Sequence, residues 1–271
     1  MQLIEKRIVV TGGSSGIGAE LAAQLAARGN RVVLVAHDEE RLRRTEETIR
    51  AATGADVSSV VCDIGRSDEI DAAAERLLAG GPVDVLVNNA GYGVYRAFEA
   101  EDADEIERLL AVNLVGHVRF TKRLLAPMIE RRSGAISFVA SIAGRVPITP
   151  NATYCAAKHG MFGLAEALRY ELRRFGVEVT AVCPGRVETP FFDHPTFRER
   201  TRGPENKGAI GVERVGRAIV GAIERARPVT YVPGTLGVAT WLYESLPLIT
   251  KPLFSRVMGA RIERLYADVT R

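Results

Sequence analysis

The chain has 271 residues, 46% hydrophobic and 25% charged, which is typical of a globular protein with a substantial core. Its 36 basic and 33 acidic residues leave a net charge of +3, too small an excess to indicate nucleic acid as a partner. Cys62, Cys155 and Cys183 are far apart and fit neither a disulfide framework nor a zinc site. We therefore expect buried free thiols, no metal and a cytoplasmic location. The N-terminus lacks the basic and apolar regions of a secretion signal.

Short runs that are apolar throughout alternate with helical patterns, which is typical of parallel strands covered on both faces. The predicted strands are Arg7–Thr11, Arg31–Ala36, Val57–Cys62, Val83–Val87, Ala135–Ala140, Val177–Cys183 and Thr230–Pro233. The predicted helices between them include Ala19–Arg28, Glu39–Ala52, Asp68–Ala79 and Ala152–Arg174. This order predicts an α/β fold of the Rossmann type, a doubly wound parallel sheet of about seven strands with helices on both faces.

A glycine-rich turn, Thr11-Gly12-Gly13-Ser14-Ser15-Gly16-Ile17-Gly18, follows the first strand and opens a helix. A dinucleotide pyrophosphate binds free backbone N–H groups at the positive end of a helix, and glycines leave that backbone bare. The cofactor-binding residues predicted here are Gly12, Ser14, Ser15, Gly16, Ile17 and Gly18. The G-x3-G-x-G spacing behind a threonine resembles the short-chain dehydrogenase/reductase family.

The end of the second strand bears on the choice of cofactor. In such folds a carboxylate there holds the 2′-hydroxyl of NAD and repels the 2′-phosphate of NADP. Here the strand ends on Ala36, His37 follows, and Arg41 lies one turn into the next helix. Asp38 is expected to cap the helix that begins at Glu39, and a guanidinium attracts phosphate. NADP(H) is therefore favoured, with NAD(H) as the alternative.

Tyr154 and Lys158 lie four residues apart, on one face of a predicted helix. A phenol titrates near pH 10, and a nearby ammonium is expected to lower that pKa toward the working range. Alone, such a pair is common on solvated helices. Ser141 and Asn113, however, complete the family's catalytic tetrad. The resemblance implies that the serine hydrogen-bonds the substrate oxygen and that the asparagine holds a water in the proton relay.

Three further stretches match cofactor-binding segments of the family. Asp63-Ile64 resembles its adenine contact, Asn88-Asn89-Ala90-Gly91 its NNAG turn, and Pro184–Thr189 its PGxVxT segment. Beside His37 and Arg41, the resemblance implies that the cofactor is bound by Asp63, Ile64, Asn89, Ala90, Gly91, Tyr154, Lys158, Pro184, Gly185, Val187 and Thr189.

The resemblance spans roughly residues 6–233 and implies a dinucleotide-binding catalytic domain over 1–235, with a substrate lid at about 186–210. The lid carries Phe191, Phe192 and Phe197, which either cap an apolar substrate or anchor the loop. We expect an oxidoreductase that moves hydride between NADP(H) and a lipophilic carbonyl or secondary alcohol, with Tyr154 as general acid and base. The alternatives are an NAD-dependent alcohol dehydrogenase and a non-catalytic NADP(H)-binding regulatory protein; the latter usually lacks part of the tetrad.

Residues 236–271 form a C-terminal helical extension with the only tryptophan, Trp241. Its charges exclude a membrane-spanning helix, and Pro247 and Pro252 are expected to break it into short pieces. Apolar residues at three- and four-residue steps among basic ones allow packing on the protein's own body, a subunit interface or a peripheral membrane contact. Packing on the body is the commonest of the three and is favoured. The resemblance implies a homodimer or homotetramer acting on a small molecule.

Three histidines lie near the predicted site in the sequence. His159 follows Lys158, but adjacent helical residues face different directions, so it is expected to point away from Tyr154. His117 and His194 are expected to be structural or surface groups.

Overall fold

The computed structural model describes residues 1–198 and 208–266, so residues 199–207 of the expected lid and 267–271 of the extension lie outside it. Within the described chain, seven parallel strands form one sheet in the order β3-β2-β1-β4-β5-β6-β7. The strands are β1 (Arg7–Thr11), β2 (Arg31–Ala36), β3 (Val57–Val61), β4 (Val85–Asn88), β5 (Gly134–Val139), β6 (Val177–Pro184) and β7 (Val229–Val232). Each lies within two residues of its predicted ends, and the predicted fold class is confirmed.

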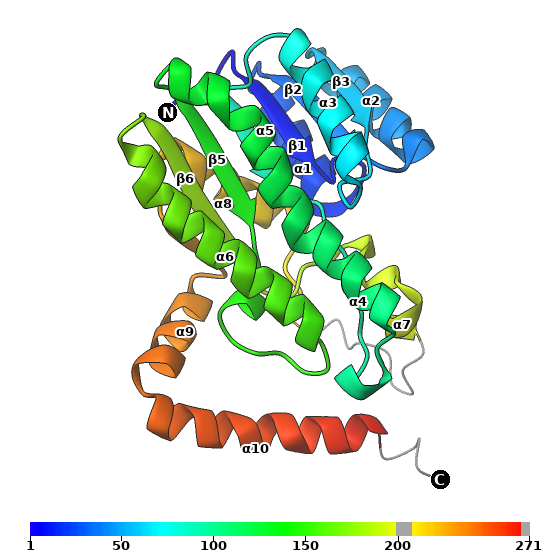
Figure 1. Cartoon of the computed structure of the whole chain (residues 1–271), viewed down its shortest axis with the longest axis vertical. Helices are drawn as coiled ribbons and strands as arrows, with labels where there is room; N and C mark the ends of the chain where they lie inside the picture. The colour runs from blue at the N-terminus through cyan, green and yellow to red at the C-terminus, as the bar shows by residue number, and fades with distance from the viewer. Residues whose placement is uncertain (199–207, 267–271) are drawn as a thin grey trace.

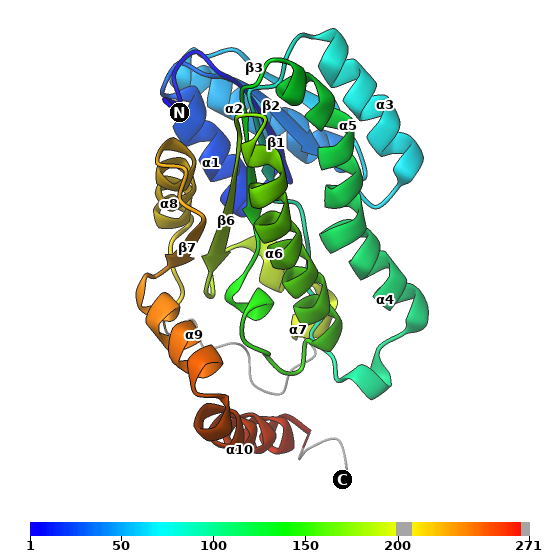
Figure 2. The same ribbon diagram turned by 60° about the vertical axis from the view of Figure 1, so that its left-hand side comes forward.

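Helices cover both faces of the sheet, with α1 and α8 on one side and α3, α5 and α6 on the other (Figure 2). The α-helices are α1 (Gly16–Ala26), α2 (Glu39–Thr53), α3 (Ser67–Ala79), α4 (Ala103–Leu110), α5 (Gly116–Glu130), α6 (Ala152–Arg173), α7 (Pro195–Arg198), α8 (Val212–Glu224), α9 (Thr235–Ser245) and α10 (Pro247–Tyr266). Short 3-10 helices are η1 (Phe98–Ala100), η3 (Ile142–Gly144) and η4 (Pro190–Asp193), and a π-helical turn, η2 (Ala111–Val115), joins α4 to α5.

Two cores explain why the strands are apolar throughout. Successive side chains of a strand point to opposite faces, so Val9 packs toward α3, α5 and α6, while Ile8 and Val10 pack toward α1 and α8. All three cysteines are buried and free, as the sequence predicts.

The strand order reverses between β1 and β4, and ligands of such sheets bind where the strands end at this point. Hydrogen bonds hold the two strand ends together. The Thr11 hydroxyl oxygen accepts from the N–H groups of Asn89 (2.9 Å) and Ala90 (3.1 Å), and Asn89 Nδ2 donates to the Thr11 carbonyl (2.9 Å). The glycine turn and the NNAG turn are therefore one bonded unit.

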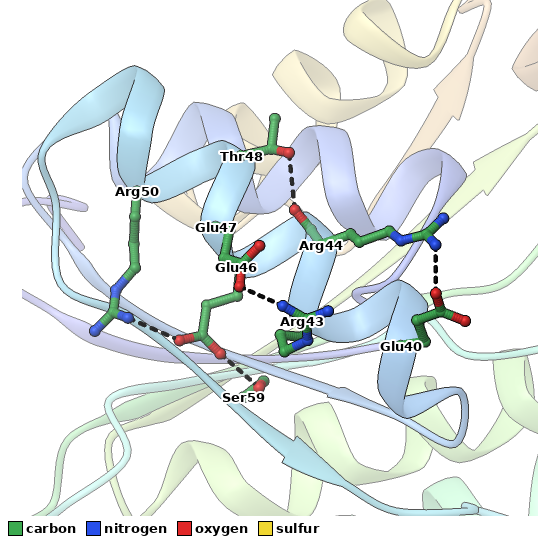
Figure 3. A network of polar contacts seen from close by, with 8 residues as sticks. All are labelled: Glu40, Arg43, Arg44, Glu46, Glu47, Thr48, Arg50 and Ser59. Atoms are coloured by element: carbon green, nitrogen blue, oxygen red, sulfur yellow. Dashed lines mark hydrogen bonds and ion pairs between the residues drawn. The ribbon is translucent and has the colours of Figure 1, made fainter.

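Helix α2 carries on its exposed face a set of charged pairs one turn apart. They are Arg43 with Glu47, Arg44 with Glu40, and Arg50 with Glu46 (Figure 3). Glu46 also accepts a hydrogen bond from Ser59 of β3, which joins the helix to the sheet. Each pair stabilises the helix by only a few tenths of a kcal/mol. Together they support the helix whose first turn carries Arg41.

The chain ends in α9 and α10, and α10 lies across the end of the molecule toward which the strands point (Figure 1). Pro247 begins α10, but Pro252 lies inside it, so the expected second break is wrong. The carbonyl deprived of an N–H partner by Pro252 belongs to Leu248, which is 91% exposed, so water can bind it. No described helix combines the length and apolar character needed to cross a membrane.

Candidate active site

A cavity of about 700 Å³ lies at the carboxyl ends of the strands. It reaches from His37 and Arg41 at one end to Tyr154 and Lys158 at the other. All of the predicted site residues line it except Gly18 and Asn113, which lie directly behind lining residues. The structure thus brings together motifs that are spread over about 180 positions of the sequence.

The glycine turn is packed so closely that side chains would not fit. Gly12 and Gly16 have φ values of +67° and +53°. A Cβ on Gly12 would lie 2.8 Å from Ala90 Cα, and one on Gly18 would lie 2.2 Å from the Gly12 carbonyl oxygen. Ser15, the N-cap of α1, makes no side-chain capping hydrogen bond. The N–H groups of the first turn are therefore available to donate to a ligand. This bare helix start fits a diphosphate group.

The adenosine end of the cavity carries the groups that would select the cofactor. Asp38 accepts a hydrogen bond from the Arg41 N–H (2.9 Å), so its predicted helix-capping role is confirmed. Its carboxylate also lies 3.5 Å from Arg41 Nε, in a pair whose arginine side chain is 57% exposed. Exposed pairs are weak, and a phosphate dianion can compete for the guanidinium.

Arg108 of α4 is a further cation that lines this cavity, and the sequence reasoning missed it. Its guanidinium donates to Asp63 Oδ2 (2.6 Å), and the Gly65 N–H donates to Asp63 Oδ1 (2.8 Å). Burial acts to raise the pKa of Asp63, but the hydrogen bonds from Arg108 and Gly65 hold that pKa below its ordinary value. The pair keeps the Asp63 carboxylate, which belongs to the predicted adenine contact, in its charged form.

His117 supports the NNAG turn from behind. The side chain is completely buried, which excludes a surface role and agrees with a structural one. Nε2 donates to the Ala90 carbonyl (2.7 Å), and Nδ1 lies 3.2 Å from Asn88 Oδ1. Burial, assisted by the charge of Lys158, lowers the His117 pKa to about 3, so the ring is neutral at physiological pH.

Tyr154 and Lys158 project from α6 toward the end of β5. Lys158 is 3% exposed, and its Nζ donates to the Val139 carbonyl (3.2 Å) and lies 5.7 Å from the centroid of the Tyr154 ring. Burial lowers the pKa of Lys158 to about 8. Burial also raises the pKa of Tyr154 above its ordinary value, although the hydrogen bond with Ser141 lowers it.

The lowered tyrosine pKa expected from the sequence is therefore wrong for this structure. Desolvation disfavours the phenolate more than the local hydrogen bond favours it. The consequence is chemical, because a phenol that stays protonated at neutral pH is poised to donate a proton rather than to accept one.

Asn113 lies in the π-helical turn between α4 and α5, a type of irregularity often found at functional sites. Its amide Nδ2 donates to the carbonyls of Tyr92 (3.0 Å) and Leu109 (3.1 Å). Its Oδ1 is buried and makes no hydrogen bond within the described residues. A Cβ on Gly91 would come within 2.4 Å of this oxygen, so only a glycine leaves room beside it. A buried acceptor without a partner suits a bound water.

Aromatic rings cover the tyrosine from the far side of the cavity. The rings of Phe191 and Tyr154 meet edge to face at 5.5 Å between centroids, and Phe192 and Phe197 pack on Phe191 at 5.2 and 5.8 Å. A Cβ on Gly93 would lie 2.3 Å from the Phe191 ring, so the glycine makes room for it. This end of the cavity is suited to an apolar molecule.

The other histidines divide between the surface and the cavity. His159 is exposed and its Nδ1 bonds the Cys155 carbonyl (2.8 Å), so it takes no part in the constellation. His194 stacks on Tyr92 at 5.7 Å and lines the cavity, which the sequence did not predict. Over the described residues, no three His, Cys, Asp or Glu side chains are grouped as a metal site would require.

Comparison with known proteins agrees with this geometry. The family model described as short chain dehydrogenase matches residues 6–198. A candidate ketoacyl reductase of Streptomyces coelicolor is 44% identical over 186 residues, which are 67% of this chain and 70% of the relative. A 3-dehydrosphinganine reductase of Danio rerio is 34% identical over 230 residues, or 81% and 69% of the two chains. A solved variant of actinorhodin polyketide ketoreductase with NADPH has a TM-score of 0.78 at 33% identity, covering 87% of this chain and 98% of its own.

The protein therefore belongs to the short-chain dehydrogenase family, whose members are oxidoreductases acting on keto or hydroxyl groups.

Proposed function

We propose that this protein is an NADP(H)-dependent reductase of a lipophilic ketone, with Tyr154 as its proton donor. The observation that carries the proposal is the convergence of Tyr154, Lys158 and Ser141 at one end of a cavity that is also lined by a bare helix N-terminus. A nicotinamide cofactor bound along this cavity would supply the hydride.

Each side chain of the constellation has a separate task in the reduction. Ser141 orients the substrate carbonyl and stabilises the charge that gathers on its oxygen. Tyr154 gives its phenol proton to that oxygen, and burial keeps the phenol protonated at neutral pH until it does so. Lys158 holds a positive charge beside the phenol, and Asn113 Oδ1 accepts from a water through which the proton is replaced.

The cofactor would be held by the residues predicted from the sequence. The first-turn N–H groups of α1 bind the diphosphate, and Asp63 and Ile64 flank the adenine. Arg41, with His37 beside it, contacts the 2′-phosphate and so favours NADP(H) over NAD(H). The NADPH in the solved polyketide ketoreductase supports this preference.

The lipophilic substrate follows from the walls of the cavity near Tyr154. They include Phe191, Phe192, Phe197 and Ile148. The names of the relatives support the same class, since they describe reduction of ketoacyl, 3-dehydrosphinganine and polyketide compounds.

The test is a panel of carbonyl compounds assayed by oxidation of NADPH and of NADH. The panel contains 3-ketoacyl thioesters, long-chain ketones, open-chain keto sugars and keto acids. We expect the highest kcat/KM for long-chain ketones or ketoacyl compounds with NADPH. Preference for a sugar or an acid would contradict the substrate class, and no turnover of any compound with either cofactor would contradict the activity.

A further inference from the structure

The C-terminal segment exposes an unusual amount of apolar surface. Among the described residues, fourteen large hydrophobic side chains are exposed. Eight of them lie in one stretch of twenty positions, 238–257, which belongs to α9, α10 and the residue between them. We call this set the α9–α10 apolar surface; its members are Val238, Trp241, Leu242, Leu246, Leu248, Ile249, Leu253 and Val257. Side chains of this kind are normally scattered over a protein surface, so such a concentration indicates an interaction site.

The surface is held in place by contacts on the opposite side of the two helices. Glu244 of α9 forms a two-pronged ion pair with Arg145, which follows η3. Tyr243 of α9 packs edge to face on Phe254 of α10 at 5.3 Å between ring centroids. The expectation that the segment packs on the protein's own body is therefore met for only one side of it, and the apolar side is left exposed.

The position of α10 links the apolar surface to the candidate active site. The Thr149 hydroxyl lies 3.8 Å from Met258 Sδ of α10. The neighbours Ile148 and Asn151 in the same loop line the cavity. Figure 1 shows α10 lying across the end of the molecule toward which the strands point. The helix that carries the apolar surface is thus in contact with a loop that forms part of the cavity wall.

The charges of α10 identify the occupant. Its sequence carries four basic residues and one acidic residue, and Lys251 and Arg256 are exposed. Ile249, Leu253 and Val257 recur at four-residue steps, so they form one stripe along the helix, 68%, 63% and 53% exposed. An apolar stripe with the exposed Arg256 beside it and a tryptophan nearby, on a helix with a net positive charge, is complementary to the boundary between acyl chains and anionic headgroups.

We propose that the α9–α10 apolar surface docks the protein onto an anionic lipid surface, with the mouth of the cavity beside the bilayer. The docking goes beyond the proposed reductase activity and does not depend on it, because lipid binding is measured without turnover. It also provides a route by which a lipophilic molecule reaches the cavity from the bilayer.

Trp241 is a built-in probe for this docking. It is the only tryptophan of the chain and is 62% exposed, so its emission reports this surface alone. With the full chain, vesicles of phosphatidylcholine and phosphatidylglycerol are expected to shift its emission to the blue and to pellet the protein. Vesicles of phosphatidylcholine alone are expected to do so more weakly, and added salt is expected to reduce the difference.

Two variants and a matched control separate apolar from charge contacts. Leu253→Ser is expected to weaken partition onto mixed vesicles roughly tenfold, because the leucine side chain would no longer be buried in the lipid. Arg256→Glu is expected to weaken binding to the anionic vesicles only. Ile4→Ser removes an apolar side chain of similar exposure, 58%, far from this surface, and is expected to bind as the wild type does.

Two results would overturn the proposal. The first is a folded full-length chain that neither pellets with anionic vesicles nor changes its tryptophan emission. The second is a Trp241 emission shift that appears without lipid as the protein concentration is raised. The wild-type protein would then have twice the mass of the monomer in solution, and Leu253→Ser would have the mass of the monomer. That result would show that a second copy of the chain covers the surface.

Discussion

The protonation of Lys158 gives the sharpest quantitative prediction. Burial lowers the pKa of its ammonium from the ordinary value of 10.5 to about 8, so its charge is present below pH 8 and lost above it. The charged fraction falls from about 90% at pH 7 to about 10% at pH 9. Because the cation stabilises charge near Tyr154, ketone reduction is expected to fall about tenfold per pH unit above pH 8.

The assay is the pH dependence of the rate at low concentrations of both NADPH and a ketone without ionisable groups, which reports ionisations of the free enzyme. Circular dichroism confirms that the protein stays folded to pH 10. In Lys158→Arg the cation stays protonated, so its residual activity is expected to be flat from pH 7 to pH 9.5. A wild-type profile that is equally flat would refute the role given to the lysine charge.

Three further substitutions test separate parts of the site. Arg41→Glu is expected to raise KM for NADPH roughly tenfold or more while changing KM for NADH little, and equal effects would contradict the phosphate contact. Gly18→Ala, whose Cβ would meet the Gly12 carbonyl, is expected to destabilise the fold by about 1–3 kcal/mol in urea unfolding and to weaken NADPH binding. Its control Gly163→Ala, a helical site open on all sides, is expected to be neutral or stabilising by up to about 1 kcal/mol, so equal losses would sink the packing argument. The pKa of His117 is about 3 in the folded protein, below its unfolded value, so the unfolding free energy of the wild type is expected to fall by about 2 kcal/mol as the pH drops from 6.5 to 5. His117→Gln is expected to lose correspondingly less over this range. Equal losses in the two proteins would mean that another group titrates.

Much of the fold could be predicted because its causes are local. A strand buried on both faces must be apolar along its length, so segments such as Arg31–Ala36 were delimited to the residue. The first helix was predicted to start at Ala19, after the glycines, because glycine has a low helix propensity. In the structure α1 begins at Gly16, because the close packing of this turn leaves no room for side chains.

The parts of the site that the sequence did not reveal depend on contacts between distant residues. Arg108 lies 45 positions from Asp63, and His117 lies 27 from Ala90, so only the folded chain shows that they meet. The tyrosine pKa went in the unexpected direction because residue spacing places Lys158 near Tyr154 but gives no measure of their desolvation. Similarly, the sequence of α10 shows an apolar stripe, but only the structure shows that the rest of the described chain leaves this stripe exposed.

The central claim is that Tyr154 gives its proton to the substrate carbonyl. Its most direct test is Tyr154→Phe, which removes the hydroxyl and keeps the ring that packs against Phe191. We predict that kcat for the best ketone falls by about 10²–10⁴-fold. The dissociation constant for NADPH, measured by fluorescence titration, is expected to stay within about twofold of the wild type, because general-acid catalysis acts on the chemical step. A variant that binds NADPH normally and retains wild-type turnover would contradict the account.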